Sequence, residues 1–403
     1  MYKIVNRRKL WATRMADGLG RLLFLPRRLF RKNEPIDPGR VQSILVVRTA
    51  YLGDVVMTLP MLRPLRQRFH DATLSFLTSP GARPLLENNP YVDEIITYAP
   101  FWFYPSKLRD YWALIRRLRK RRFDLVIEVR GDIREILALV APLRARYKVG
   151  YDVGGGGYLL THVVPYPELK HKVEYHLDIA RYLGCDVDGE MDWGIRLTEG
   201  ERERVRGILR ETGIPRSFVC VHPGGRLPLK RWGGENFSRL CDRITQDLGL
   251  AVVLLGSPDE RSLVAQISAG MRTRPFCLAG QLSLRELAGV LSEAALFVGN
   301  DSAPMHIAAA IRTPTVAIFG PSKSVETRPY GDTHQVVEKP VTCRSECDES
   351  HCRNREHHAC LKSITPDDVV RVVETSMPCS ATWLKKGSRL CHSRGSPWTV
   401  RPT

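Results

Sequence analysis

A single carboxylate follows the first strongly apolar segment of this chain. Residues 44–48 read as a buried strand, Gly53 and Asp54 end the short loop after it, and a helix follows. Ligands of open α/β sheets bind at the carboxyl ends of the strands, so Asp54 is suited to act as a general base. The plain alternative is that Asp54 only caps the following helix. The segment lacks G-x-G-x-x-G and therefore matches a dinucleotide-binding loop poorly.

Two loops in the second half of the chain also follow predicted strands and are suited to anions. In residues 222–234, Gly224 and Gly225 permit close backbone approach, and Lys230 or Arg231 supplies positive charge. In residues 256–260, Glu260 begins a helix, where an acid is favoured by the helix dipole or could bind ribose hydroxyls. These residue types predict a site for a phosphorylated nucleoside.

A third strand–loop–helix segment covers residues 299–306. Pro304 suits the first turn of a helix, and the free amides of that turn, with Ser302, make a plausible diphosphate site. Asp301 in the same loop indicates either a sugar hydroxyl as ligand or a cap. His306 could act as an acid or a base, but a packing role is the more common one for such a histidine.

The elements that must position these loops alternate strand and helix in two halves. Such alternation predicts an α/β fold with parallel sheets. We expect a Rossmann-like domain over residues 41–200 and a second over 215–345, facing each other across a cleft, with a polar linker between them. A Cys/His-rich segment and a closing helix are expected over 346–378.

Composition narrows the classes of partner. The chain has 403 residues, a formal net charge of +18 and 43% apolar residues, so it can bury cores and should bind something acidic. Nucleic acid, an anionic membrane and a phosphorylated substrate all fit, but no nucleic-acid-binding motif is present. No spanning segment and no signal peptide are apparent, so we expect a cytoplasmic protein whose ten cysteines are mostly reduced.

The charge is concentrated at the ends. Residues 1–40 interleave many Arg and Lys with Trp11, Met15, Leu19 and other apolar side chains, as in an amphipathic segment on an anionic membrane. The alternative is a poorly ordered basic tail. Residues 379–403 are also basic and are expected to be disordered.

Several motifs together resemble glycosyltransferase family nine, the heptosyltransferase-like enzymes that build the lipopolysaccharide core. The resemblance spans roughly residues 42–376. It is carried by residues 44–60, 89–93, 171–174, 298–310 and 319–322.

The resemblance implies a GT-B fold and an inverting transfer that needs neither a metal nor another cofactor. Asp54 would deprotonate the acceptor hydroxyl, and Lys230 would lie near the diphosphate of a nucleotide-sugar donor, with ADP-heptose favoured. Glu260 would face the nucleoside, and Asp301 and Ser302 the junction of diphosphate and sugar. The remaining donor-side residues are Gly224, Gly225, Ala303 and His306, and those expected on the acceptor side are Arg48, Gly53 and Arg109.

This chain departs from the family pattern at one position. The resemblance also predicts the kind of acceptor. Ala303 stands where the family usually has glycine, so its methyl group could narrow the phosphate pocket and alter the donor. The acceptor is expected to be an acidic glycolipid of the lipopolysaccharide core. Such an enzyme would work as a peripheral protein at the inner face of the cytoplasmic membrane.

Four alternatives remain open from the sequence. Asp186 and Asp188 match the D-x-D letters of a metal-dependent transferase, although a turn is favoured. Cys343, Cys347, Cys352 and Cys360 could hold zinc, although reduced or locally paired thiols are favoured. The other two alternatives are a sugar-nucleotide epimerase on the same scaffold and a non-catalytic basic adaptor at a membrane.

Overall fold

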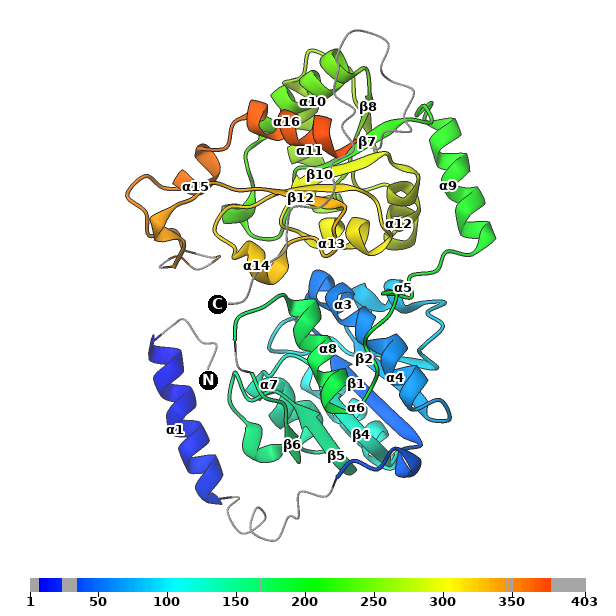
Figure 1. The fold of residues 1–403 in the computed structure, drawn as a ribbon, viewed down its shortest axis with the longest axis vertical. Helices are drawn as coiled ribbons and strands as arrows, with labels where there is room; N and C mark the ends of the chain where they lie inside the picture. Colours follow the sequence, from blue (N-terminus) through cyan, green and yellow to red (C-terminus); the bar gives the residue numbers. More distant parts are fainter. Residues whose placement is uncertain are drawn as a thin grey trace.

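The computed structural model describes residues 7–23, 35–166, 168–345, 347, 349 and 351–377. It contains two six-stranded sheets, each with helices on both faces, stacked one above the other in Figure 1. All strand pairs in both sheets are parallel. The prediction of two facing Rossmann-like α/β domains is therefore confirmed.

The N-terminal sheet has the strand order β3-β2-β1-β4-β5-β6. Residues 44–47 of its central strand β1 are all apolar, as expected for a strand that is covered on both faces and paired on both edges. The strands are β1 (Ser43–Arg48), β2 (Thr73–Thr78), β3 (Glu94–Thr97), β4 (Phe123–Glu128), β5 (Ala145–Gly150) and β6 (His162–Val163). The helices are α3 (Leu52–Thr58), α4 (Leu62–Arg68), α5 (Arg83–Leu86), α6 (Leu108–Lys120), α7 (Ile133–Glu135) and α8 (Lys172–Tyr182).

The C-terminal sheet repeats this topology with the order β12-β11-β10-β7-β8-β9. Its strands are β7 (Phe218–His222), β8 (Ala251–Leu254), β9 (Phe276–Cys277), β10 (Leu296–Asn300), β11 (Thr315–Ile318) and β12 (His334–Val337). Its helices are α9 (Glu199–Glu211), α10 (Gly234–Leu248), α11 (Arg261–Ala269), α12 (Leu284–Glu293), α13 (Ala303–Ala310), α14 (Ser324–Thr327), α15 (Ala359–Lys362) and α16 (Pro366–Ser376).

Each sheet has a point where the strand order reverses. In the N-terminal sheet it lies between β1 and β4, and in the C-terminal sheet between β7 and β10. Ligands of such sheets bind in the crevice at this point, beyond the carboxyl ends of the strands. The segments that carry Asp54, Lys230 and Asp301 follow β1, β7 and β10, so the topology brings these three predicted site segments to the two crevices.

The structure differs from the sequence-based elements at several places. Pro60 lies in a 3-10 turn over Leu59–Met61, so residues 55–68 belong to two helices, α3 and α4, and not to one continuous helix. The predicted linker contains α9, which has a capping box from Thr198 and Glu201 and packs against α12. The short edge strands β6 and β12 were not predicted because they offer little hydrophobic pattern.

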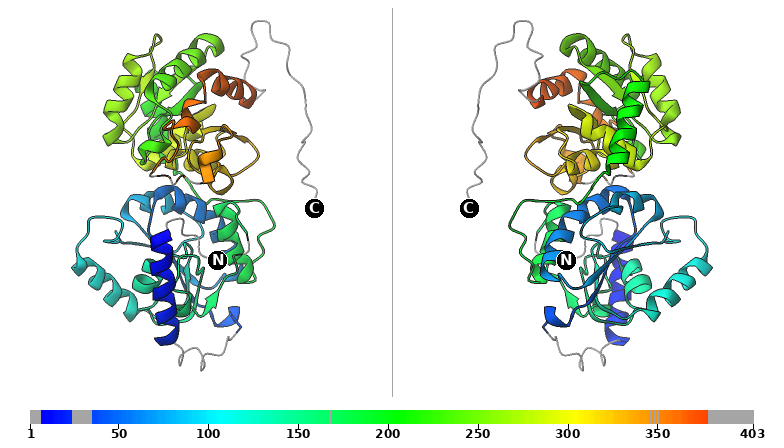
Figure 2. Two further views of the ribbon diagram at one scale, coloured as in Figure 1. Left: turned by 90° about the vertical axis from the view of Figure 1, so that its left-hand side faces the viewer. Right: turned by 90° about the vertical axis from the view of Figure 1, so that its right-hand side faces the viewer.

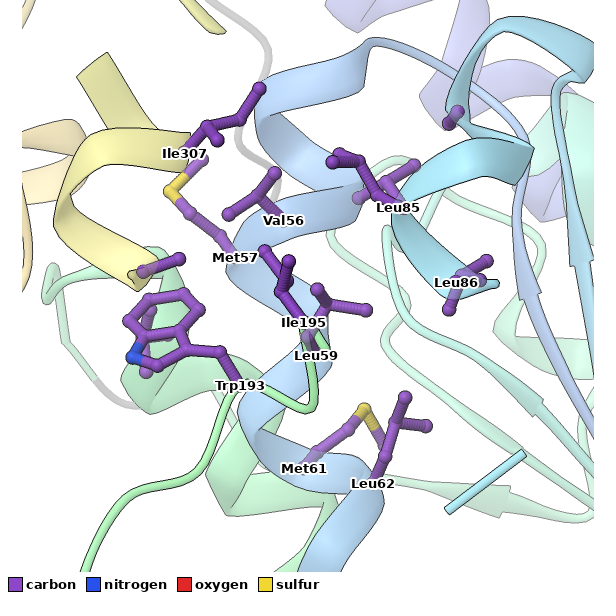
Figure 3. Packing of buried hydrophobic residues seen from close by; sticks show 14 of the residues in the cluster. Val56, Met57, Leu59, Met61, Leu62, Leu85, Leu86, Trp193, Ile195 and Ile307 are labelled. Carbon is purple, nitrogen blue, oxygen red and sulfur yellow. The ribbon is translucent and has the colours of Figure 1, made fainter. Parts of the chain in front are cut away.

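An apolar contact joins the two domains. Figure 3 shows Ile307 of α13 beside Val56 and Met57 of α3, and these side chains are buried in one cluster that extends into both domains. Nearby, Trp193 from the connection between the domains packs in the same cluster. Because α3 and α13 each begin at a predicted site loop, this contact fixes the two loops relative to each other.

Helix α1 (Arg7–Leu23) lies along the side of the N-terminal domain (Figures 1 and 2). Within the described residues, no helix combines the length and the apolar character that crossing a bilayer requires. The predicted disordered tail at 379–403 lies outside the described residues.

Candidate functional site

A cavity of about 1350 Å³ lies between the domains. Asp54 lines it from the N-terminal domain, and Lys230, Glu260, Asp301 and Ser302 line it from the C-terminal domain. The other predicted residues that line it are Arg48, Gly53, Gly225, Ala303 and His306. The tertiary structure therefore gathers most of the residues predicted from the sequence around one space.

Asp54 lies in the first turn of α3, but its side chain is not a cap. Its Oδ2 is 2.9 Å from Arg48 Nη2, and its Oδ1 accepts a hydrogen bond from Lys172 Nζ at 2.9 Å. Burial alone would raise the pKa of Asp54, but Lys172 and Arg48 outweigh it and hold that pKa well below its usual range. The side chain is therefore a fixed, ionised carboxylate at the wall of the cavity.

Lys172 is a site residue that the sequence analysis did not assign. It begins α8, the last helix of the N-terminal domain, whose N-cap is His171, and it lines the same cavity. The segment 171–174 supported the family resemblance, which was the available signal. The sequence of that segment, however, does not show which carboxylate Lys172 contacts.

Lys230 lies between two carboxylates. Its Nζ donates to Asp301 Oδ2 at 2.8 Å and lies 3.0 Å from Glu349 Oε1. Burial would lower the pKa of Lys230, but these carboxylates raise it above its usual value. The ammonium therefore keeps its charge at the cavity wall, and the half-exposed Glu349 is the partner that an incoming anion could replace.

Glu260 ties two loops together. Its carboxylate accepts hydrogen bonds from the backbone N–H of Gly225 at 2.7 Å and of Ser257 at 2.8 Å, and His222 Nε2 lies 3.3 Å away. Burial raises its pKa, but His222 and the two amides lower it well below the usual range. Gly224 does not line the cavity, and a methyl group there would come within 2.0 Å of Glu260 Oε1.

His222 and Asn300 are further residues missing from the sequence-based set. The His222 ring lies between Glu260 and Ser302, with Nδ1 3.3 Å from Ser302 Oγ. Asn300 Nδ2 donates to the carbonyls of Pro223 at 2.7 Å and Gly224 at 3.0 Å. His222 and Asn300 are the last residues of the buried strands β7 and β10. Their hydrogen bonds therefore connect the loops that follow these two strands.

The start of α13 meets the start of α3. Ser302 is the N-cap of α13 and makes no side-chain bond to the helix, so the first amides of α13 remain available to an anion. A methyl group on Gly53 would come within 2.8 Å of His306 Cδ2 and 3.6 Å of Ala303 Cα. His306 is buried, and burial lowers its pKa to about 4, so it is neutral and packs at the domain contact.

Cations and aromatic rings form a second unpredicted feature of the cavity. Arg130 and Arg134 each lie 4.5 Å from the centroid of the Phe103 ring, and Arg226 lies 4.4 Å from that of Tyr51. Because Arg226 belongs to the C-terminal domain, its contact with Tyr51 crosses the cleft. The three arginines give this part of the cavity wall positive charge suited to an acidic ligand.

Arg109 is the predicted acceptor residue that the structure does not bring to the site. It lies on α6 with its side chain 76% exposed, 3.5 Å from Asp110, and does not line the cavity. The buried residues of α6 are Leu114, Ile115 and Leu118, so the basic side of this helix faces outward. The charge of the segment was visible in the sequence, but its direction was not.

The two candidate metal motifs have other structures. Asp186 accepts the backbone N–H of Asp188 at 2.9 Å, which is a turn, and neither aspartate lines the cavity. The four cysteines of residues 343–360 line a small separate pocket. In the part of the chain that the structure describes, no three His, Cys, Asp or Glu side chains are arranged to hold a metal ion.

Known proteins share this sequence and architecture. A sequence model described as glycosyltransferase family 9 (heptosyltransferase) matches residues 111–358. The chain is 30% identical to lipopolysaccharide heptosyltransferase 3 of Escherichia coli strain K12, over 84% of this chain and 99% of that protein.

Solved structures agree. A glycosyl transferase family 9 protein from Veillonella parvula superposes with a TM-score of 0.73 at 22% identity, covering 85% of this chain and 98% of the other. The ADP-heptose LPS heptosyltransferase II of E. coli superposes with a TM-score of 0.66 at 25% identity, covering 83% and 98%. The two facing domains are thus the predicted GT-B architecture. The chain belongs to glycosyltransferase family 9, the heptosyltransferase family.

Proposed function

We propose that this glycosyltransferase moves a heptose from ADP-heptose to an acidic saccharide of the lipopolysaccharide core, with inversion and without a metal. The observation that carries the proposal is the position of Asp54 opposite Lys230 and Ser302 in one cavity. The relatives are lipopolysaccharide heptosyltransferases, and the name of one of them, ADP-heptose LPS heptosyltransferase II, includes ADP-heptose.

The donor would lie against the C-terminal domain. Its diphosphate would accept hydrogen bonds from the amides at the start of α13 and would pair with the ammonium of Lys230. In that ion pair it would replace the Glu349 carboxylate. Asp301 would keep Lys230 in place and would accept a hydrogen bond from a sugar hydroxyl. The nucleoside would extend along the loop between Ser257 and Glu260, which also lines the cavity.

The acceptor would lie against the N-terminal domain. Its acidic groups would bind Arg130 and Arg134 of the N-terminal domain and Arg226, which reaches across the cleft to Tyr51. One acceptor hydroxyl would point at the Asp54 carboxylate. Lys172 and Arg48 hold that carboxylate in a single orientation.

The bond changes then follow. The acceptor oxygen attacks the anomeric carbon from the face opposite the diphosphate, the bond from that carbon to the diphosphate oxygen breaks, and ADP leaves with the electron pair. The hydroxyl proton passes to Asp54. A carboxylate with a low pKa suffices because the oxygen becomes strongly acidic only as its new bond to carbon forms. Lys230 and the α13 amides stabilise the charge on ADP.

Asp54→Asn separates the assigned roles. Removal of a general base costs about 10²–10⁴-fold in rate, so heptose transfer should fall by that factor while calorimetry shows ADP-heptose binding largely kept. Asp71→Asn, on the exposed surface, is the matched control. Loss of donor binding in Asp54→Asn would contradict the role of Asp54, and loss of wild-type activity in EDTA would contradict metal independence.

The donor itself is tested by ligand stabilisation. ADP-heptose should raise the melting temperature more than ADP-glucose or UDP-sugars, since a ligand that binds only the native state stabilises it by mass action. A larger shift with another nucleotide sugar would change the assigned donor.

We place the reaction at the inner face of the cytoplasmic membrane, where a lipid-linked acceptor is available to a basic protein.

A further inference from the structure

Helix α1 docks on the N-terminal domain through its polar side. Asp17 is buried, and its Oδ1 accepts the backbone N–H of Gly156 at 2.8 Å. Gly20 packs so closely on Tyr158 that a methyl group there would meet the ring at 2.2 Å. Thr13, one turn before Asp17, lines the interdomain cavity. The docking face is thus made of small and polar residues, seated on the loop that contains Gly156.

The opposite side of α1 is apolar and faces outward. Trp11, Met15, Leu19, Leu22 and Leu23 are each between 58% and 68% exposed. Their spacing of four, four, three and one residues places them on one face of a helix. A helix of a globular protein normally turns such a face to the core, so this orientation requires an external partner.

The charge of the helix selects the partner. Arg14 and Arg21 are exposed, and Asp17, the sole acid in the sequence of α1, is buried against the domain. A second copy of the chain would bring two basic helices together within molecules of net charge +18, which repel each other. A bilayer with anionic headgroups instead accepts apolar side chains below its surface and cations at it.

We propose that α1 is a membrane-binding helix, which enters the surface of an anionic bilayer with its Trp11–Leu23 face while Asp17 holds its other face on the protein. The purpose of this membrane binding, which is to bring the enzyme to a lipid-anchored acceptor, rests on the proposed function. Since Thr13 belongs to the cavity wall, the bound membrane would lie beside the cleft. A lipid-anchored acceptor would then reach the arginines near Asp54 without leaving the bilayer.

Sedimentation with vesicles tests the binding. The full chain should bind vesicles of phosphatidylcholine with phosphatidylglycerol and bind phosphatidylcholine alone much more weakly. Leu19→Glu/Leu22→Glu should lower the partition coefficient about tenfold or more, because two leucines that would enter the bilayer are replaced by charged side chains. Leu169→Glu/Val325→Glu changes the net charge equally on other exposed apolar residues and should leave binding within about twofold.

Contrary outcomes are distinct. Equal binding of wild type and the Leu19/Leu22 variant would overturn the proposal, as would equal binding to neutral and anionic vesicles. Sedimentation velocity that shows a dimer broken by the same variant, with no vesicle binding, would assign the face to a second copy of the chain.

Activity separates this inference from the proposed function. On acceptor embedded in anionic vesicles, Leu19→Glu/Leu22→Glu should transfer more slowly than wild type, and on a water-soluble delipidated acceptor it should match wild type. Asp17→Ala, which frees the docked face, should keep vesicle binding and lose rate only on the embedded acceptor. Absence of transfer by wild type to both acceptors would refute the function, while vesicle binding would still decide the role of α1.

Discussion

Lys172 donates a hydrogen bond to Asp54 over 2.9 Å, although 118 positions separate them in the chain. With Arg48 on the other carboxylate oxygen, the lysine holds Asp54 ionised and directed at the cavity. The proposed base Asp54 is therefore firmly oriented but weakly basic. This pair gives the first prediction.

Lys172→Met should raise the pKa of Asp54 toward its ordinary value, because one of the cations that oppose the effect of burial is gone. The acid limb of kcat/KM for transfer should then move to higher pH. Lys107→Met, at an exposed position, removes the same charge away from the cavity and is the control. Superimposable pH–rate profiles for wild type and Lys172→Met would show that Asp54 does not act in the transfer step.

Gly53→Ala should disturb the contact between α3 and α13. The new methyl group would meet the His306 ring at 2.8 Å, and His306 is held in a buried position. We expect activity to fall by about tenfold or more, since small displacements of reacting groups are costly. Gly81→Ala, whose surroundings are open, should keep full activity. Steady-state kinetics of the two variants, with circular dichroism to confirm folding, make the measurement.

Glu260→Gln should weaken donor binding more than it lowers kcat. Its side-chain NH₂ would face either Gly225 N–H or Ser257 N–H, so one backbone donor loses its acceptor and the loop after β7 loosens. We expect the donor Kd to rise by about 5- to 150-fold, from a loss of about 1–3 kcal/mol. Calorimetry with ADP-heptose measures this effect. Asp368→Asn alters the capping box that Thr365 and Asp368 form on α16, where no residue lines the cavity, and should leave Kd unchanged.

Mild acid should destabilise the fold through buried histidines. Burial lowers the pKa of His171 to about 4, of His176 to about 3 and of His306 to about 4. Between pH 6.5 and these values the unfolded chain binds protons that the folded chain does not, so stability falls as pH falls. Each histidine contributes on the order of 3 kcal/mol across its window.

Calorimetry at several pH values checks this prediction. The melting temperature should drop by about 5 °C or more from pH 7 to pH 5, and His176→Gln should make the dependence shallower. His70→Gln, on the exposed surface, should leave the dependence as it is. Asp54 adds a loss of the same sign at lower pH, because its folded pKa is depressed and its stabilising effect fades below about pH 4.

Much of the site was accessible from the sequence because its residues follow strands. Asp54, Lys230, Glu260 and Asp301 each lie in the loop or first helical turn after a predicted strand, and the parallel strands of a sheet place such segments at one edge. The family resemblance then assigned the roles. The family and the two-domain fold both followed from local motifs and alternation, which depend little on how distant segments pack.

The tertiary structure alone decided which side chains meet. The pairing of Lys172 with Asp54, the stacking of Arg226 on Tyr51 and the outward turn of Arg109 depend on how helices and domains pack over long sequence separations. Helix α1 makes the same point, since its sequence shows two faces but not which face docks. Local patterns set secondary structure and the loops that carry charge, whereas the partner of each charge is set by packing between distant segments.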